Sequence, residues 1–271
     1  MYKLIALDMD GTLLNSDKQI SSDTKRAIAS ARENGTKVVL ASGRPIDGME
    51  RQLNELGIDG NNEFVLYYNG SMVKELGSQK VIHRRIINGK AAKEVAQLAN
   101  QLGLNVHAFS EEHGLITPVN SEYTQLEATI NGLNITEMSF DGLSDDHPII
   151  KVMIVGEPSK LTKAIKGLHA ELHSRYTIVQ SAPFFLEFLN LESNKGLGIK
   201  AIADYLQISA EEIICVGDAE NDNHMIKFAG LGVAMSNAME ETKALADFIA
   251  PSNDEDGVAA VIDKFLLSPC E

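Results

Sequence analysis

The feature that most constrains the fold is an alternation of short apolar runs with helical segments at the start of the chain. Residues 3–7, 37–41 and 64–68 are mostly apolar runs of strand length, which is typical of strands buried on both faces. Helical patterns separate them, near residues 22–35 and 45–57. Parallel strands joined by right-handed helical crossovers fit this order, so it predicts a doubly wound parallel α/β sheet.

The pattern changes from about residue 83. Strand-like runs there come in pairs, 105–109 with 115–119 and 176–180 with 184–189. The remaining ordered patterns are two helices and one further apolar run, at residues 90–102, 159–173 and 149–155. Paired strands with few helices are typical of an antiparallel α+β unit.

The strand–helix alternation returns near residue 194. It consists of helices at 196–206, 221–229 and 256–267 and strands at 213–216 and 231–234. We therefore predict a discontinuous core of residues 1–82 and 191–271, with a second domain of residues 83–190 inserted into it.

Composition and charge limit the class of partner. The chain has 271 residues, 44% of them apolar and 23% charged, which is typical of a soluble globular protein. With 24 Lys and Arg against 38 Asp and Glu, its net charge is −14. Such a surface repels nucleic acid and anionic membranes, so neither is an expected partner. A site for a phosphorylated metabolite needs local positive charge or a bound cation.

The two cysteines, Cys215 and Cys270, are too few and too isolated for a disulfide framework or a zinc site. The sequence has no apolar run long enough for a membrane span and no signal-peptide pattern at its start. These features favour a cytoplasmic location.

Two acidic motifs directly follow predicted strands. Asp8 and Asp10 lie in Asp-Met-Asp-Gly-Thr after the first strand, and Asp218 and Asp222 lie in Gly-Asp-Ala-Glu-Asn-Asp after a later one. Ligands bind at the carboxyl ends of strands in such sheets. Acids gathered there would need a divalent cation, and oxygen ligands without nearby His or Cys favour Mg²⁺. Each motif alone also fits an ordinary polar turn or an acidic helix start.

Two further features are suited to an anion. Ser42-Gly43-Arg44 follows the second strand, where a hydroxyl and exposed amides can hold a phosphate oxygen. Lys195 precedes a predicted helix, and a lysine at a helix start suits the same kind of ligand. Separately, these features also fit a plain turn and a solvated lysine.

Taken in order, the four motifs resemble the four signature motifs of the haloacid dehalogenase (HAD) superfamily. Segments 67–70, 181–187, 194–196 and 255–258 resemble the Cof-type subfamily, and the chain is similar throughout to its bacterial sugar-phosphate phosphatases. The resemblance implies a Rossmann-like core and makes the inserted domain an α/β cap that selects the substrate.

The resemblance also implies a Mg²⁺-dependent phosphatase mechanism. Asp8 would be the nucleophile and Asp10 the general acid and base, with a raised pKa. Mg²⁺ would be held by Asp8, the Asp10 carbonyl and Asp218, with Asp222 behind them fixing waters or Lys195. The groups implied to hold phosphate are Ser42, the Gly43 amide, Lys195, Asn221 and the Met9 amide. Arg44 is expected near the leaving group.

The same residues are also compatible with other functions. A phosphomutase shares the same nucleophile and acid, and a non-catalytic metabolite-binding protein could keep the fold. HAD ATPases have Thr at the position of Asp10, so Asp10 favours a phosphatase or a phosphomutase. Sugar, flavin and pyridoxal phosphates are all possible substrates, and the oligomeric state is not indicated.

Two other segments resemble metal sites only superficially. Residues 252–257 resemble part of a calcium loop, but the first position is Ser252 rather than Asp and the twelfth is Asp263 rather than Glu. His107 and His113 flank two glutamates without the spacing of a zinc motif, and both are expected to be solvated loop histidines.

Overall fold

The computed structural model describes residues 1–268 and divides into two compact units. The first comprises Met1–Arg84 and the chain from Asn194 onward, and the second comprises Arg85–Ser193. Cys215 is buried, whereas Cys270 lies outside the described residues. Among residues 1–268, no helix combines the length and the apolar character needed to cross a bilayer.

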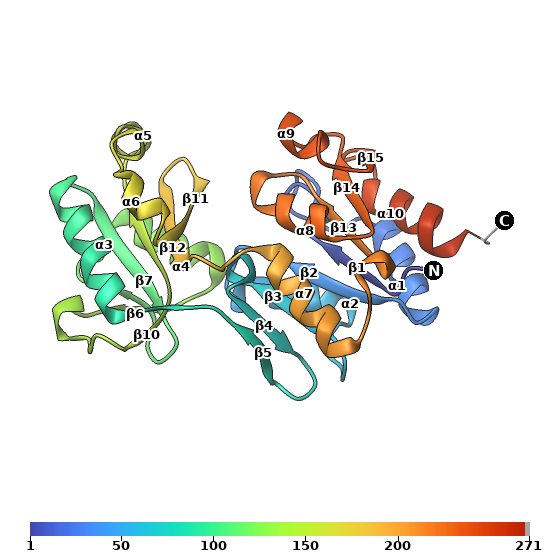
Figure 1. The fold of residues 1–271 in the computed structure, drawn as a ribbon, viewed down its shortest axis with the longest axis horizontal. Helices are drawn as coiled ribbons and strands as arrows, with labels where there is room; N and C mark the ends of the chain where they lie inside the picture. Colours follow the sequence, from blue (N-terminus) through green and yellow to red (C-terminus); the bar gives the residue numbers. More distant parts are fainter. Residues whose placement is uncertain (269–271) are drawn as a thin grey trace. The chain divides into compact units, whose positions relative to one another are not determined.

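The first unit is built on an eight-stranded sheet. Its order is β15 (Phe248–Ala250), β14 (Leu231–Met235), β13 (Ile213–Gly217), β1 (Leu4–Leu7), β2 (Lys37–Ala41), β3 (Phe64–Tyr67), β4 (Met72–Glu75) and β5 (Val81–Arg84). β1 pairs in parallel with both β2 and β13, so the two ends of the chain share one sheet, blue beside orange in Figure 1. The predicted parallel α/β sheet is confirmed.

The far edge of this sheet differs from the prediction. β4 and β5 are antiparallel, and neither strand is expected from the sequence pattern. The chain reverses after β3 through a short turn, Tyr68–Gly70, in which Asn69 (φ 55°) and Gly70 (φ 87°) adopt left-handed backbone. Asn and Gly tolerate that conformation best, so the Asn-Gly pair ends the parallel part of the sheet.

Helices cover both faces of the sheet. Leu4 and Ala6 pack with residues of α7 (Lys195–Leu206) and α8 (Asn223–Phe228). Because side chains alternate along a strand, Ile5 and Leu7 point to the other face. The helices that pack together there are α1 (Ser22–Glu33), α2 (Glu50–Leu56) and α10 (Gly257–Ile262), the last continued by a π-helical turn, Asp263–Leu267. The remaining helix, α9 (Glu240–Lys243), packs beside β14.

Two predicted helices of this unit begin later than expected. The segment predicted from residue 45 starts as a 3₁₀ turn, Asp47–Met49, before α2. The segment predicted from residue 221 starts as a second 3₁₀ turn, Glu220–Asp222, before α8. Tight 3₁₀ turns are common at helix starts, and the second turn carries the acidic motif.

The second unit contains a seven-stranded sheet. Its order is β11 (Tyr176–Ala182), β12 (Phe185–Asn190), β10 (Pro148–Val155), β7 (Asn105–Ser110), β8 (Gly114–Thr117) and β9 (Ile135–Glu137), with β6 (Ile87–Asn88) also paired to β10. All pairs are antiparallel except β8 with β9, which confirms the predicted α+β character.

Four helices complete this unit: α3 (Gly89–Gln101), α4 (Glu122–Asn131), α5 (Pro158–Lys166) and α6 (Ala170–His173). The single helix predicted over 159–173 is interrupted after Lys166, where Gly167 forms the C-cap of α5. Glycine favours helix ends, so the helix stops at Gly167 although the apolar periodicity of the sequence continues beyond it. α4 and β9 were not predicted.

His107 contradicts the prediction of a solvated loop histidine. It lies in β7, is fully buried, and contacts the Thr124 hydroxyl and the Met153 sulfur, each at 3.2 Å. Burial, with a smaller contribution from the charge of Lys151, lowers the pKa of His107 to about 3. The imidazole is therefore neutral in the folded protein.

We expect this histidine to make the second unit sensitive to acid. Between pH 6.5 and 3 the unfolded state binds a proton that the folded state does not, so stability falls as the pH drops through that window. The loss from pH 7 to pH 5 is about 2 kcal/mol. Thermal unfolding of His107→Phe should be less acid-sensitive than that of the wild type, whereas the exposed control His173→Gln should match the wild type. Equal sensitivity in all three proteins would contradict this assignment.

Candidate active site

The site is centred on a buried lysine between two carboxylates. Lys195, at the first position of α7, is fully buried, and its Nζ donates to Asp8 Oδ1 at 2.5 Å and to Asp222 Oδ1 at 2.6 Å. Asp8 directly follows β1, and Asp222 closes the 3₁₀ turn after β13. Since β1 and β13 are parallel neighbours, their carboxyl ends bring together residues more than 200 positions apart.

Asp218 completes the acidic cluster. Its Oδ1 accepts from the Thr12 hydroxyl at 2.8 Å, and its backbone N–H donates to Asp222 Oδ2 at 2.9 Å. Gly11 has a left-handed backbone (φ 89°), and a Cβ there would lie 2.5 Å from Asp218 Oδ2. The glycine of the first motif is thus required for the close approach of the last motif.

The local charges shift the pKa values of this cluster. Burial, together with the charges of Asp222 and Asp218, raises the pKa of Asp8 well above its ordinary value despite the opposing charge of Lys195. Burial raises the pKa of Asp218 as well. Burial acts to lower the pKa of Lys195, but Asp222 and Asp8 outweigh it and raise that pKa. One lysine does not compensate all the negative charge gathered here.

The donor set fits a divalent cation. Carboxylate oxygens of Asp8, Asp218 and Asp222 all lie within 4.8 Å of one another. Both oxygens of Asp222 are used by the chain itself, one by Lys195 and the other by the amides of Asp218 and Ala219. Asp8 and Asp218 therefore remain the better ligands, and their oxygens suit Mg²⁺. A bound cation would also stabilise the charged form of Asp8.

The residues predicted to hold phosphate lie around the same strand ends. Ser42 follows β2, and its hydroxyl accepts from the Arg44 amide at 3.2 Å. Asn221 lies in the 3₁₀ turn after β13, and its Nδ2 donates to Asn69 Oδ1 at 3.0 Å. Gly43 faces the same Asn69, whose side-chain amide would lie 3.0 Å from a Cβ on that glycine. The Met9 side chain is fully buried beside Asp8.

Asn69 is a functional candidate that was not among the predicted site residues. It is buried after β3, and its backbone N–H donates to the Ser42 carbonyl at 2.9 Å. It thus ties the Ser42 segment to Asn221. The sequence signals at this position were Asn-Gly at a strand end, which is also an ordinary turn signal, and the resemblance of segment 67–70 to the Cof-type subfamily.

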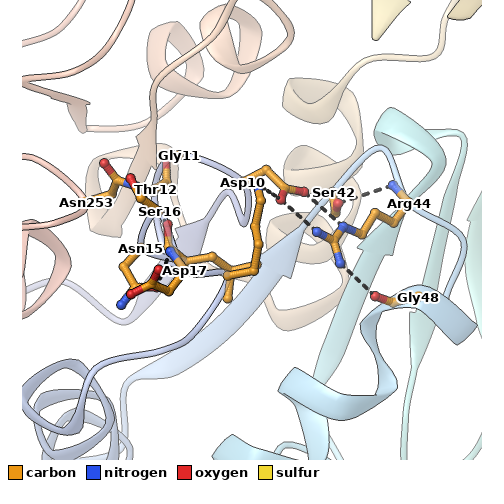
Figure 2. Close-up of polar contacts among 12 residues, drawn as sticks. Asp10, Gly11, Thr12, Asn15, Ser16, Asp17, Ser42, Arg44, Gly48 and Asn253 are labelled. Atoms are coloured by element: carbon orange, nitrogen blue, oxygen red, sulfur yellow. Dashed lines mark hydrogen bonds and ion pairs between the residues drawn. The ribbon is translucent and has the colours of Figure 1, made fainter. Parts of the chain in front are cut away.

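Asp10 differs from the prediction in its partners and in its pKa. Its carboxylate binds Arg44 through two hydrogen bonds, Nε to Oδ2 at 2.9 Å and Nη2 to Oδ1 at 2.7 Å (Figure 2). Lys18 Nζ also donates to Asp10 Oδ1 at 2.9 Å. Burial acts to raise the pKa of Asp10, but the hydrogen bonds and charges of Arg44 and Lys18 outweigh it and hold that pKa below its ordinary value. The expected raised pKa is wrong for this arrangement, because the sequence does not reveal the two cations.

Comparison with known proteins agrees with this geometry. The sequence model described as haloacid dehalogenase-like hydrolase matches residues 5–262. The chain is 36% identical to YxeH of Bacillus subtilis (strain 168) over 270 residues, covering 99% of this chain and 100% of that protein. It is 30% identical to the 5-amino-6-(5-phospho-D-ribitylamino)uracil phosphatase YcsE of the same strain over 266 residues, covering 98% of this chain and 96% of that protein.

Solved structures give the same result. A haloacid dehalogenase-like hydrolase from Bacteroides thetaiotaomicron is 35% identical with a TM-score of 0.86, covering 97% of this chain and 99% of that chain. The HAD subclass IIB sugar phosphatase BT4131 is 27% identical with a TM-score of 0.79, covering 97% of this chain and 98% of that chain. The protein belongs to the haloacid dehalogenase-like hydrolase family and is a phosphatase of that family.

Proposed function

We propose that the protein is a Mg²⁺-dependent phosphatase that hydrolyses small phosphorylated metabolites, specifically sugar phosphates, through an aspartyl-phosphate on Asp8. The observation that carries the proposal is the buried Asp8–Lys195–Asp222 cluster with Asp218 beside it. The similarity to the phosphatase YcsE supports phosphorylated small molecules as substrates, and the similarity to the sugar phosphatase BT4131 supports the sugar class.

In the first step a carboxylate oxygen of Asp8 attacks the phosphorus of the substrate. The new O–P bond forms as the bond from phosphorus to the leaving oxygen breaks, and Asp10 gives its proton to that oxygen. Lys195, the Ser42 hydroxyl, the amides of Met9 and Gly43, and Asn221 hold the phosphate oxygens.

In the second step water attacks the phosphorus of the aspartyl-phosphate. Asp10, now a carboxylate, takes the proton from the water, and the bond between phosphorus and the Asp8 oxygen breaks. Inorganic phosphate leaves and Asp8 is restored. The observed pairing of Asp10 with Arg44 and Lys18 favours the ionised form that this second step requires. For the first step, Asp10 must carry a proton and face the leaving oxygen.

Asp8, the Asp10 carbonyl and Asp218 would hold Mg²⁺. The ion would supply positive charge to the transferring phosphoryl group, which is the main requirement of this chemistry. Asp222 acts behind these ligands, because its oxygens already orient Lys195 and the amides of Asp218 and Ala219.

We further propose that residues 1–82 and 191–271 form the catalytic core and that residues 83–190 form the cap that selects the leaving group. The inserted position of the Arg85–Ser193 unit supports this assignment. The proposed setting is the cytoplasm, and the proposed ligands are small phosphorylated metabolites rather than nucleic acid or membranes.

Phosphate release from a panel of sugar, flavin and pyridoxal phosphates tests this proposal. We expect release in Mg²⁺, with sugar phosphates ranked first, and a loss of more than about 100-fold in excess chelator. Release that is unaffected by chelator would contradict the metal requirement. An isomerised sugar phosphate without free phosphate would instead identify a phosphomutase, and binding without turnover a metabolite-binding protein.

A further inference from the structure

The carboxylate of Asp10 is held from two sides by two separate segments of the chain. Arg44 comes from the loop after β2. Its Nη1 donates a hydrogen bond to the Gly48 carbonyl at 3.2 Å, which holds the side chain in place (Figure 2). Lys18 comes from the loop after the first motif, and its side chain is 64% exposed. Asp10 Oδ1 accepts from both cations, whereas Oδ2 accepts from Arg44 and from no other of residues 1–268. Since each oxygen has two lone pairs, Oδ2 keeps one for a proton.

Lys18 adopts an unfavourable backbone conformation. Its φ is 59°, in the left-handed region that glycine and asparagine tolerate best. The loop around it is tightly closed, with the Lys18 amide donating to the Asn15 carbonyl at 2.9 Å. The Asn15 side chain accepts from the amides of Asp17 and Gln19. A lysine at a position suited to glycine indicates that its side chain is needed there.

A distant segment anchors the same loop. Asp254 accepts from the Ser16 amide at 2.7 Å and from the Ser16 hydroxyl at 2.6 Å. Asn253 Nδ2 donates to the Leu14 carbonyl at 2.9 Å. These two residues belong to the 252–257 segment, which only superficially resembles a calcium loop. Their contacts fix the loop from which Lys18 reaches Asp10.

We propose that Lys18 is a positioning residue. Together with Arg44, it fixes the Asp10 carboxylate so that Oδ2 exchanges the proton with the leaving group. Asp254 in turn fixes the loop that carries Lys18. The inference rests on the proposed function, in which Asp10 protonates the leaving oxygen. Lys18 binds the carboxylate of Asp10 and, among residues 1–268, contacts none of the atoms assigned to the phosphate or the metal. Its removal therefore affects proton transfer and leaves phosphate binding unchanged.

The leaving group provides the test. An alkyl phosphate has a strongly basic leaving oxygen that needs a positioned acid, whereas 4-nitrophenyl phosphate needs little help. We expect Lys18→Gly to lower kcat/KM about tenfold for a hexose phosphate and less than about twofold for 4-nitrophenyl phosphate. Lys18→Arg should restore most of the loss. Asp254→Ala should give the same selective loss at about threefold.

Two controls separate positioning from a structural role. Glycine suits the backbone of residue 18, so Lys18→Gly should unfold within about two degrees of the wild type. Gln79→Gly is the matched control, since Gln79 is exposed with φ 59° in the turn before β5 and should leave both substrates unaffected. Inhibition by inorganic phosphate should be the same in the wild type and Lys18→Gly.

The outcomes distinguish this inference from the function on which it rests. Equal loss on both substrates, or weaker inhibition by phosphate, would overturn the positioning role while phosphatase activity stands. Unchanged kcat/KM on the hexose phosphate would do the same. A wild-type protein that hydrolyses neither substrate would contradict the proposed function and this inference with it.

Discussion

Asp8→Asn is expected to lower phosphate release by more than about 10³-fold while leaving the fold intact. An amide oxygen is a poor nucleophile, and no other carboxylate of the described site can replace Asp8. Asp218 is held by Thr12, and Asp222 is held by Lys195 and two backbone amides. The measurement is release of phosphate from the best substrate of the panel, under single-turnover and steady-state conditions.

The buried position of Asp8 explains why this variant should still fold. Burial and two neighbouring carboxylates raise the pKa of Asp8, so its charge is unfavourable in the metal-free protein. Asparagine keeps the shape and removes that charge, while Lys195 keeps Asp222 as its partner. Thermal unfolding without metal should occur at or above the wild-type temperature. Asp17→Asn, an exposed residue in the loop after the first motif, is the control for activity. Normal turnover by Asp8→Asn would refute the nucleophile assignment.

Much of the core could be predicted because its signals are local and repeated. Short apolar runs predicted the strands, and a polar motif after each run placed Asp8, Ser42 and Asp218 at one edge of a parallel sheet. That rule requires only the direction of the strands, which the helical crossovers supply. Lys195 was predicted from its place before a helix, although its complete burial between two acids could not be read from its neighbours in sequence.

The partners of Asp10 could not be predicted, for a physical reason. β1 ends at Leu7 and the chain turns from Met9, so strand periodicity does not place Asp10, which joins Arg44 and Lys18 instead. Lys18 depends on a loop in which Ser16 is anchored by Asp254, 238 positions from Ser16. Such pairings follow from loop geometry and not from hydrophobic periodicity. The β4–β5 hairpin was missed for a similar reason, because the Asn-Gly turn changes the direction of the chain.

Lys195→Met is expected to lower both stability and activity. Methionine has a similar length, but it leaves Asp8 and Asp222 buried without their cation. Removing one partner of a buried ion pair lowers the free energy of unfolding by about 3–5 kcal/mol. Without the positive charge of Lys195 beside the transferring phosphoryl group, kcat should fall by roughly 10²–10³-fold. The measurements are thermal unfolding in chelator and phosphate release in saturating Mg²⁺, with the exposed Lys200→Met as the control on the same helix.

The pH dependence of this variant separates the ion pair from simple packing. Without Lys195, the charge that opposes the raised pKa of Asp8 is lost, so the folded state binds more protons than the unfolded state above the ordinary pKa of aspartate. Stability is then lost as the pH rises through the folded-state pKa, and the deficit should be larger at pH 8 than at pH 5. Adding Asp222→Asn removes one uncompensated charge and should recover part of the stability but none of the activity. A deficit that is independent of pH, or a double variant no more stable than Lys195→Met, would show that packing accounts for the loss.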